Sequence, residues 1–214
     1  MKPKIALFVH QPKCSIQSCN GIIDALSDHY AFKIFTKHMV EDDFFYDVDC
    51  VCFPGGIGDS DSFDTLLRHN IKLVRNYISN GGRYLGICMG AYWADRHYFN
   101  VLSDVNVVQY YKRPTSETKR PHAKAMPVTW KGEKTKMYFY DGCTFTGDGK
   151  FQTIATYPNG DPMAIIQNRI GLIGCHPESG KFWYDYYSWM SKHWTGKNQY
   201  HLLKDFVDTL INEF

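Results

Sequence analysis

The sequence predicts one α/β domain built on a mostly parallel β-sheet that is sandwiched by helices, with an antiparallel β segment added. In the first half of the chain, short apolar runs alternate with helical patterns, which favours parallel strands joined by crossover helices. From Val101 onward, short runs are separated by Gly, Pro, Asp and Asn turns, which favours antiparallel strands. The 214 residues contain no repeat, low-complexity tract or linker, so a single domain over residues 1–214 is expected.

The first half of the chain is expected to supply the parallel strands. Strands are predicted over residues 4–10, 31–36 and 48–53, with a helix over 22–28. A glycine-rich loop, 54–58, then precedes one amphipathic helical stretch through 66–78, which ends at Asn80-Gly81-Gly82. Residues 83–87 are expected to form a buried central strand, followed by a helical pattern over 91–96.

The second half is expected to add an antiparallel meander and then return to the first pattern. The predicted strands cover 105–111, 125–130, 136–140 and 151–157, and a strand over 170–175 and a helix over 200–213 follow. Residues 182–194 carry seven aromatic side chains. We expect this segment to pack as a lid against the sheet edge rather than to form a substrate or partner surface, because aromatic side chains dominate packing.

Composition excludes several classes of partner. With 24 basic and 22 acidic residues, the net charge of +2 supplies no field that would steer nucleic acid or a membrane surface to the protein. No apolar run approaches the roughly 20 residues of a spanning helix. The seven cysteines form no C-x-x-C pair, so neither a zinc site nor a cofactor is expected, and reduced thiols in a cytoplasmic location fit best.

Cys88 is the candidate nucleophile. Gly86-Ile87-Cys88-Met89-Gly90 lies between a predicted strand and a helical pattern, the context of a nucleophile elbow. A helix N-terminus beside the sulfur favours the thiolate. Alone, such a cysteine is more often a small buried hydrophobic residue, and that is our interpretation of the other six. They are Cys14, Cys19, Cys50, Cys52, Cys143 and Cys175.

His176 and Glu178 are the candidate base and orienting acid. They follow a predicted strand in Gly174-Cys175-His176-Pro177-Glu178, and carboxyl ends of parallel strands meet at one sheet edge, so His176 can reach Cys88. Pro177 stiffens the turn that aims the imidazole. A nucleophile, a base and a carboxylate that holds the base form a triad.

The loop Pro54-Gly55-Gly56 is the candidate oxyanion site. It follows a predicted strand directly, so its backbone N–H groups should face the same sheet edge. We pair the N–H of Gly56 with that of Met89, because charge that develops on a carbonyl oxygen needs donors fixed in advance.

These three segments resemble, in order and spacing, the class I glutamine amidotransferase superfamily over most of the chain. Residues 82–92 and 137–142 are most similar to its biotin-protein-ligase N-terminal-like branch. The resemblance implies a flavodoxin-like fold and thioester chemistry at Cys88, but it does not by itself imply glutamine hydrolysis. Tyr92 stands where typical glutaminases carry Gln, so a different small amide or acyl compound remains open as the substrate. We expect no acceptor or synthase domain within these residues, so any ammonia would pass to a separate subunit or be lost to solvent.

Three functions remain open at this point. The first is an enzyme that hydrolyses a small amide through a Cys88 thioester. The second is a catalytically silent module that binds a ligand or partner on the same fold. The third is redox sensing by the thiol, which the arrangement of His176 and Glu178 disfavours.

Overall fold

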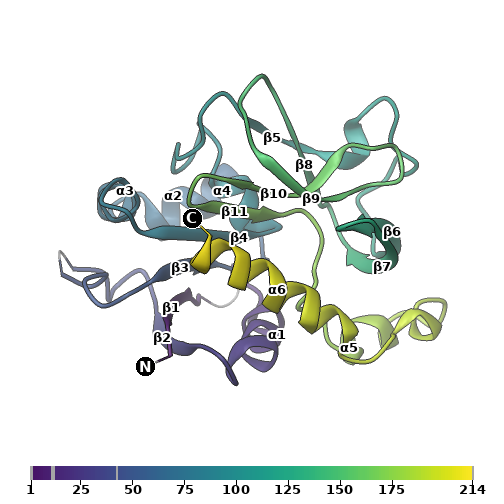
Figure 1. The fold of residues 1–214 in the computed structure, drawn as a ribbon, viewed down its shortest axis with the longest axis horizontal. Coiled ribbons are helices and arrows are strands. Elements are labelled where there is room, and N and C mark those ends of the chain that lie inside the picture. Colours follow the sequence, from purple (N-terminus) through teal and green to yellow (C-terminus); the bar gives the residue numbers. More distant parts are fainter. Residues whose placement is uncertain (1, 11–12, 42, 214) are drawn as a thin grey trace.

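In the computed structural model, which describes residues 2–10, 13–41 and 43–213, strands and helices alternate through the first half of the chain (Figure 1). The first-half elements are β1 (Lys4–Phe8), α1 (Ile16–Leu26), β2 (Ala31–Phe35), β3 (Cys50–Phe53), α2 (Ser60–Leu67), α3 (Ile71–Ser79), β4 (Arg83–Ile87) and α4 (Met89–Trp93). The remaining strands are β5 (Asn106–Gln109), β6 (Lys124–Trp130), β7 (Glu133–Phe139), β8 (Cys143–Thr146), β9 (Gln152–Thr156), β10 (Pro162–Gln167) and β11 (Ile170–Ile173). The remaining helices are α5 (Lys181–Asp185), α6 (Asn198–Asn212) and two 3-10 turns, η1 (Tyr110–Lys112) and η2 (Ser191–His193).

Within the described residues, nine strands form one sheet in the order β2-β1-β3-β4-β11-β10-β9-β6-β7. The pairs from β2 to β11 are parallel, and the pairs from β11 to β7 are antiparallel. A separate antiparallel pair, β5 with β8, lies beside the sheet (Figure 1). The predicted α/β architecture, a mostly parallel sheet between helices with an antiparallel addition, is confirmed.

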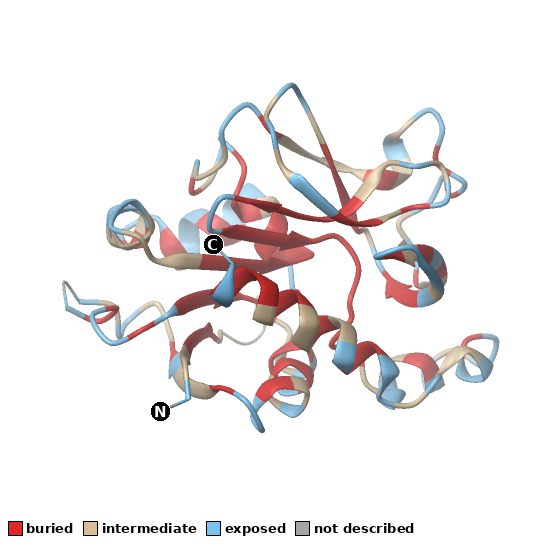
Figure 2. Ribbon diagram, viewed as in Figure 1, coloured by how far each residue is buried: buried red, intermediate tan, exposed pale blue. Residues whose placement is uncertain are grey.

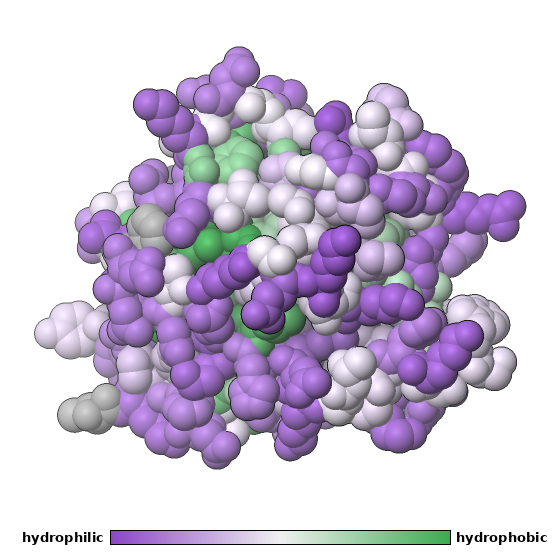
Figure 3. Space-filling view, turned by 45° about the vertical axis from the view of Figure 1, so that its right-hand side comes forward, coloured by the Kyte–Doolittle hydropathy of each residue, from purple (hydrophilic) through white to green (hydrophobic). Residues whose placement is uncertain are grey.

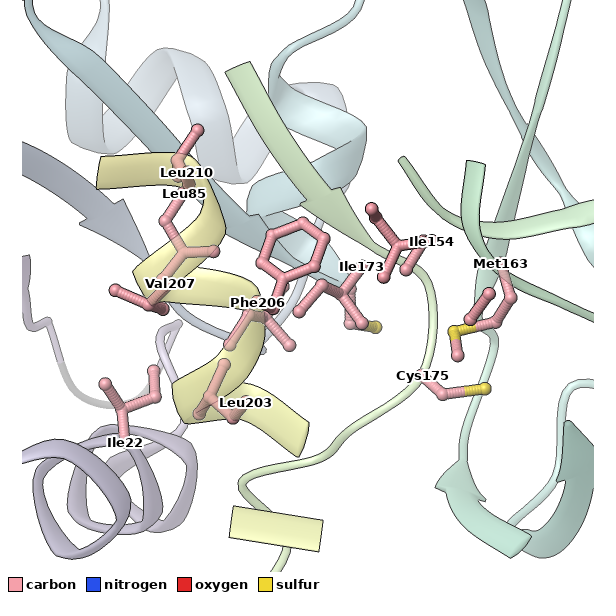
Figure 4. Close-up of a cluster of buried hydrophobic side chains, with 14 of the residues drawn as sticks. Ile22, Leu85, Ile154, Met163, Ile173, Cys175, Leu203, Phe206, Val207 and Leu210 are labelled. Atoms are coloured by element: carbon pink, nitrogen blue, oxygen red, sulfur yellow. The ribbon is translucent and has the colours of Figure 1, made fainter. Parts of the chain in front are cut away.

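Helices cover both faces of the parallel strands. On one face α1 and α6 pack on the sheet, and in Figure 4 Leu203, Phe206 and Val207 of α6 lie in one cluster with Ile22 of α1 and with Leu85 and Ile173 of the strands. On the other face α2, α3 and α4 pack on the alternate side chains of the same strands. Because both faces are covered, β3 and β11 are buried throughout and β4 is buried from Tyr84 onward, and Figure 2 shows the central strands largely in red.

Several element boundaries differ from those predicted. The helix expected over 22–28 begins at Ile16, because the Ser15 hydroxyl caps it by accepting from the N–H of Ser18 at 3.3 Å. The single helix expected through 66–78 is two helices, since α2 ends at Leu67 and a new N-cap, Asn70, begins α3. The strands expected over 4–10 and 170–175 end two residues early, at Phe8 and Ile173.

The second half contains elements that were not predicted. They are β8, β10 and α5. The strand expected over 105–111 is shorter, ends in the 3-10 turn η1, and joins β8 instead of the main sheet.

The face shown in Figure 3 is mostly hydrophilic, with hydrophobic side chains visible only in small areas. In the part of the chain that the structure describes, every helix is too short or too polar to cross a bilayer.

Candidate active site

Cys88 occupies the sharp turn between β4 and α4. Its backbone has φ 49° and ψ −100°, a conformation that is strained for a residue with a side chain. The Cys88 N–H donates to the carbonyl oxygen of Ile173 at 2.8 Å, which ties the turn to β11. The side chain is 6% exposed, and its Sγ lies 3.6 Å from the carbonyl oxygen of Tyr140. The turn thus holds the sulfur at the carboxyl end of the central strand.

The two glycines of this turn are required by close packing. A Cβ at position 86 would lie 2.4 Å from the carbonyl oxygen of Gly90, and a Cβ at position 90 would lie 2.0 Å from that of Phe53. Backbone atoms cannot move aside as a flexible side chain can, so any larger residue would open the turn. This is the local reason that the sequence has Gly on either side of Ile87-Cys88-Met89.

His176 and Glu178 lie in the turn that follows β11, the strand next to β4. His176 is 4% exposed and Glu178 is fully buried, and His176 Nδ1 bonds Glu178 Oε1 at 2.8 Å. The His176 N–H donates to the carbonyl oxygen of Tyr138 at 2.9 Å, which fixes the turn to β7. With Nδ1 engaged by the carboxylate, the other ring nitrogen, Nε2, is left for a partner.

The charge of His176 follows from its neighbours. Burial has the largest single effect and lowers the pKa of His176, but the charges of Glu178 and Cys88 and side-chain hydrogen bonds to both together raise it by a larger amount. The net effect raises the pKa from 6.5 to about 10. The imidazole is therefore held in its protonated form at neutral pH, within reach of the sulfur.

The loop after β3 lies against the same turn. A Cβ on Gly56 would lie 2.8 Å from Met89 Sδ, so the two residues of the candidate oxyanion site are neighbours. Neither the Gly56 nor the Met89 N–H donates a hydrogen bond to another residue of the described chain. The Gly55 N–H, in contrast, is not free for an oxyanion, because it donates to Ser18 Oγ at 2.9 Å. Gly55 matters through its missing side chain, since a Cβ there would lie 2.7 Å from His176 Cε1.

A cavity of about 970 Å³ opens beside Cys88. Its lining includes Gly56, Met89 and Tyr92, together with polar side chains such as Asp141. The Tyr92 hydroxyl donates to the carbonyl oxygen of Asp141 at 3.0 Å, so the ring is fixed across one wall. The volume suits a small ligand. In the described ranges, no group of three or more His, Cys, Asp or Glu side chains could hold a metal ion.

The aromatic segment 182–194 divides into a packed part and an exposed part. Tyr184 is fully buried, and the Trp183 ring lies 5.0 Å from the His176 ring, between centroids, so the segment covers the imidazole. Phe182, Tyr186 and Trp189 are 65%, 72% and 60% exposed. The expectation of a packed lid therefore holds for Trp183 and Tyr184, but not for the three exposed side chains.

Sequence reasoning missed Ser18, which contacts the candidate triad. Its hydroxyl donates to Glu178 Oε1 at 2.7 Å, although the two residues are 160 positions apart. Ser18 carries no motif of its own. The one local signal is the cap residue Ser15, which places Ser18 in the first turn of α1.

Comparisons with known proteins agree with this architecture. The family model "biotin-protein ligase, N terminal" matches residues 11–116. A glutamine amidotransferase from Thermotoga maritima superposes with a TM-score of 0.71 at 12% identity, covering 99% of both chains. PurLQS from the same organism has a TM-score of 0.68 at 13% identity, covering 98% of this chain and 100% of that one. A further glutamine amidotransferase gives 0.67 at 14% identity, covering 96% and 98%.

No curated protein sequence matches the chain. At identities this low, structural likeness shows the fold alone, because one fold hosts many functions. The chain thus has a glutamine amidotransferase-like fold, and its residues 11–116 are similar to the N-terminal family of biotin-protein ligase.

Proposed function

We propose that the protein is a cysteine-dependent amidohydrolase that cleaves the C–N bond of a small amide through a thioester on Cys88. One observation carries the proposal. His176, held by Glu178 at 2.8 Å, interacts with a cysteine in a strained strand-to-helix turn beside a cavity of about 970 Å³. A nucleophile within reach of a base that a third group orients is the arrangement that covalent catalysis needs.

The reaction proceeds in two halves. In the resting site His176 already holds the proton of the Cys88 thiol, and the thiolate attacks the amide carbonyl carbon to form a C–S bond. The C–N bond then breaks, and His176 returns the proton to the leaving amine or ammonia. In the second half the neutral His176 takes a proton from water, and the hydroxide attacks the thioester carbon and displaces the sulfur. The free acid is released, and the thiolate beside the protonated His176 is restored. Glu178 keeps the imidazole oriented and stabilises its positive charge throughout.

The N–H groups of Gly56 and Met89 are proposed to bind the oxyanion. They lie in neighbouring residues, and both are free of other hydrogen bonds to described residues. Two donors that are fixed before the reaction stabilise the developing charge without reorganisation, and one such donor is worth about 10²–10³ in kcat.

The substrate side of the cavity is shaped by Tyr92. Its ring takes the place of the Gln found in typical glutaminases, and its hydroxyl is engaged by Asp141. We therefore propose a small amide in general as the substrate class. Released ammonia passes to a separate acceptor or synthase subunit or to solvent. A free thiol nucleophile suits a reducing compartment such as the cytoplasm.

The test is ammonia release from a panel of small primary amides, glutamine among them, by the full chain and by Cys88→Ala. We expect at least one amide to be hydrolysed, and the Cys88→Ala variant to release ammonia at the background rate while its thermal unfolding is unchanged within a few degrees. Full activity of Cys88→Ala toward that amide would refute the thioester mechanism.

A catalytically silent binding module is the second candidate. It is favoured by the exposed side chains of Phe182, Tyr186 and Trp189, which form a surface without a function in the hydrolytic scheme. Failure of the whole panel, together with a Cys88 thiol no more reactive than free cysteine, would favour this reading over hydrolysis.

A further inference from the structure

Ser18 lies in the first turn of α1 and is fully buried. α1 begins beyond the carboxyl end of β1, and β1 is paired in parallel with β3, the strand that leads into the loop 54–58. This topology places Ser18 at the edge of the sheet where Cys88 and His176 lie. A buried hydroxyl in such a place needs hydrogen-bond partners.

The Ser18 hydroxyl connects two parts of the candidate active site. It donates to Glu178 Oε1 at 2.7 Å, and its oxygen accepts from the Gly55 N–H at 2.9 Å. The donors therefore form a chain from the backbone of the oxyanion loop, through Ser18, to the carboxylate. Successive hydrogen bonds of this kind polarise and strengthen one another in a buried site.

Glu178 depends on very few donors. Its Oε1 accepts hydrogen bonds from Ser18 Oγ and His176 Nδ1, while its buried Oε2 has no hydrogen-bond partner in the part of the chain described. A buried carboxylate without partners is costly. Among the described residues, Ser18 thus supplies one of two hydrogen bonds that hold the carboxylate facing the imidazole.

The backbone around Ser18 leaves little freedom. A Cβ at position 21, one turn along α1, would lie 2.0 Å from the carbonyl oxygen of Glu178, so the helix is in direct contact with the turn 176–178. A Cβ at position 55 would lie 3.3 Å from Ser18 Oγ as well as against the His176 ring. Helix, loop and turn meet at one point, and the hydroxyl is the polar group at that point.

We propose that Ser18 is a positioning residue of the proposed hydrolase. It orients His176 through Glu178, and it fixes the position of the oxyanion loop relative to the same carboxylate. This role rests on the proposed function and deepens it. Ser18 touches neither sulfur nor substrate, and it acts through the residues that do.

The test measures the second-order rate constant for alkylation of Cys88 by iodoacetamide at pH 7 in the full chain, with the Cys88 peptide followed by mass spectrometry. The variants are Ser18→Ala, Ser18→Thr, which keeps the hydroxyl, and His176→Ala. Ser116→Ala is the matched control, because the Ser116 hydroxyl is also buried and donates at 2.7 Å, to the Thr118 carbonyl oxygen away from the triad. A second readout is the pKa of His176, from the NMR titration of its ring.

We expect Ser18→Ala to slow alkylation about tenfold or more, the effect of losing a hydrogen bond to a charged group, and to lower the pKa of His176. Ser18→Thr should restore both, and Ser116→Ala should change neither, even if it lowers the melting temperature as much. Should Ser18→Ala not fold, Ser18→Cys, which keeps the volume but is a weak donor, takes its place in the same comparison.

Two results would overturn the proposal, and they differ. If His176→Ala slows alkylation but Ser18→Ala leaves the rate and the pKa of His176 at the control values, Ser18 has no positioning role and the hydrolase proposal stands. If His176→Ala does not slow alkylation, the hydrolase proposal fails and the role of Ser18 fails with it.

Discussion

Adding one methyl group at Gly55 should displace the candidate base without touching the nucleophile. In Gly55→Ala the new Cβ would meet His176 Cε1 at 2.7 Å and Nδ1 at 3.2 Å. Gly55 is not among the residues with positive φ, so alanine can adopt the backbone conformation. The contact with the imidazole is therefore the main consequence of the substitution.

The size of the displacement follows from the contact distance. Ordinary van der Waals contact for a Cβ begins at 3.4 Å, so the ring must move by about 0.7 Å from its 2.7 Å position. The Trp183 ring on one side and Glu178 on the other limit how it can move. A misplacement of about 1 Å can reduce a reaction rate about 10²-fold, so we expect alkylation of Cys88 and amide hydrolysis to slow by about tenfold to a hundredfold.

The assay compares the alkylation rate of Cys88 in the wild type, Gly55→Ala and Gly180→Ala. Gly180 is the control because its Cβ would meet nothing closer than Tyr200 Oη at 3.5 Å, an ordinary contact. Circular dichroism checks that all three are folded. Wild-type alkylation and hydrolysis rates in a folded Gly55→Ala protein would refute the idea that the position of His176 controls the sulfur.

Three further results are expected. Glu178→Gln should lower the pKa of His176 from about 10 toward 6.5 in an NMR titration, because the neutral amide no longer stabilises the imidazolium; an unchanged pKa would contradict this. Since folding raises the pKa of His176, its contribution to stability is complete below pH 6.5 and is lost as pH rises to about 10. The free energy of unfolding of the wild type minus that of His176→Ala should fall over this range, and a rise would be the wrong sign. Tyr92→Phe removes the 3.0 Å bond to the Asp141 carbonyl and should lower the free energy of unfolding by about 0.5–1.5 kcal/mol in urea titrations, whereas no loss would mean that the bond adds nothing.

The parallel half of the fold was predictable because its signals are local. Residues 83–87 form a strand with the predicted bounds, and Gly86 and Gly90 frame the turn because Cβ atoms there would meet backbone. The same reasoning placed His176 and Glu178 at the adjacent strand end, where the structure brings them to 2.8 Å from each other.

The antiparallel half was harder to predict because its pairing is set by tertiary contacts. β10 follows Asn159-Gly160-Asp161 and is a continuous apolar run, a pattern shared by buried strands and helices. β5 leaves the main sheet to pair with β8, which no periodicity of its own four residues, Asn106–Gln109, could reveal.

The hydrogen-bond network around the candidate triad was also beyond the sequence. Ser18 and Glu178 meet only after β1 and β11 take their places in the sheet. The engagement of the Gly55 N–H by Ser18, which removes it from the oxyanion site, follows from the same long-range contact. Local patterns located the groups that would do chemistry, whereas the groups that orient them depended on the fold.

The most direct test of the account is the rate of Cys88 alkylation in wild type and His176→Ala, from pH 5 to 9, with the modified residue identified by mass spectrometry. An imidazolium held beside the sulfur should make the wild-type thiol react faster than free cysteine near neutral pH. In His176→Ala the alkylation rate of Cys88 should be lower by about tenfold or more. Equal and slow labelling of both proteins would contradict the account and leave the site as a binding pocket on an amidotransferase-like fold.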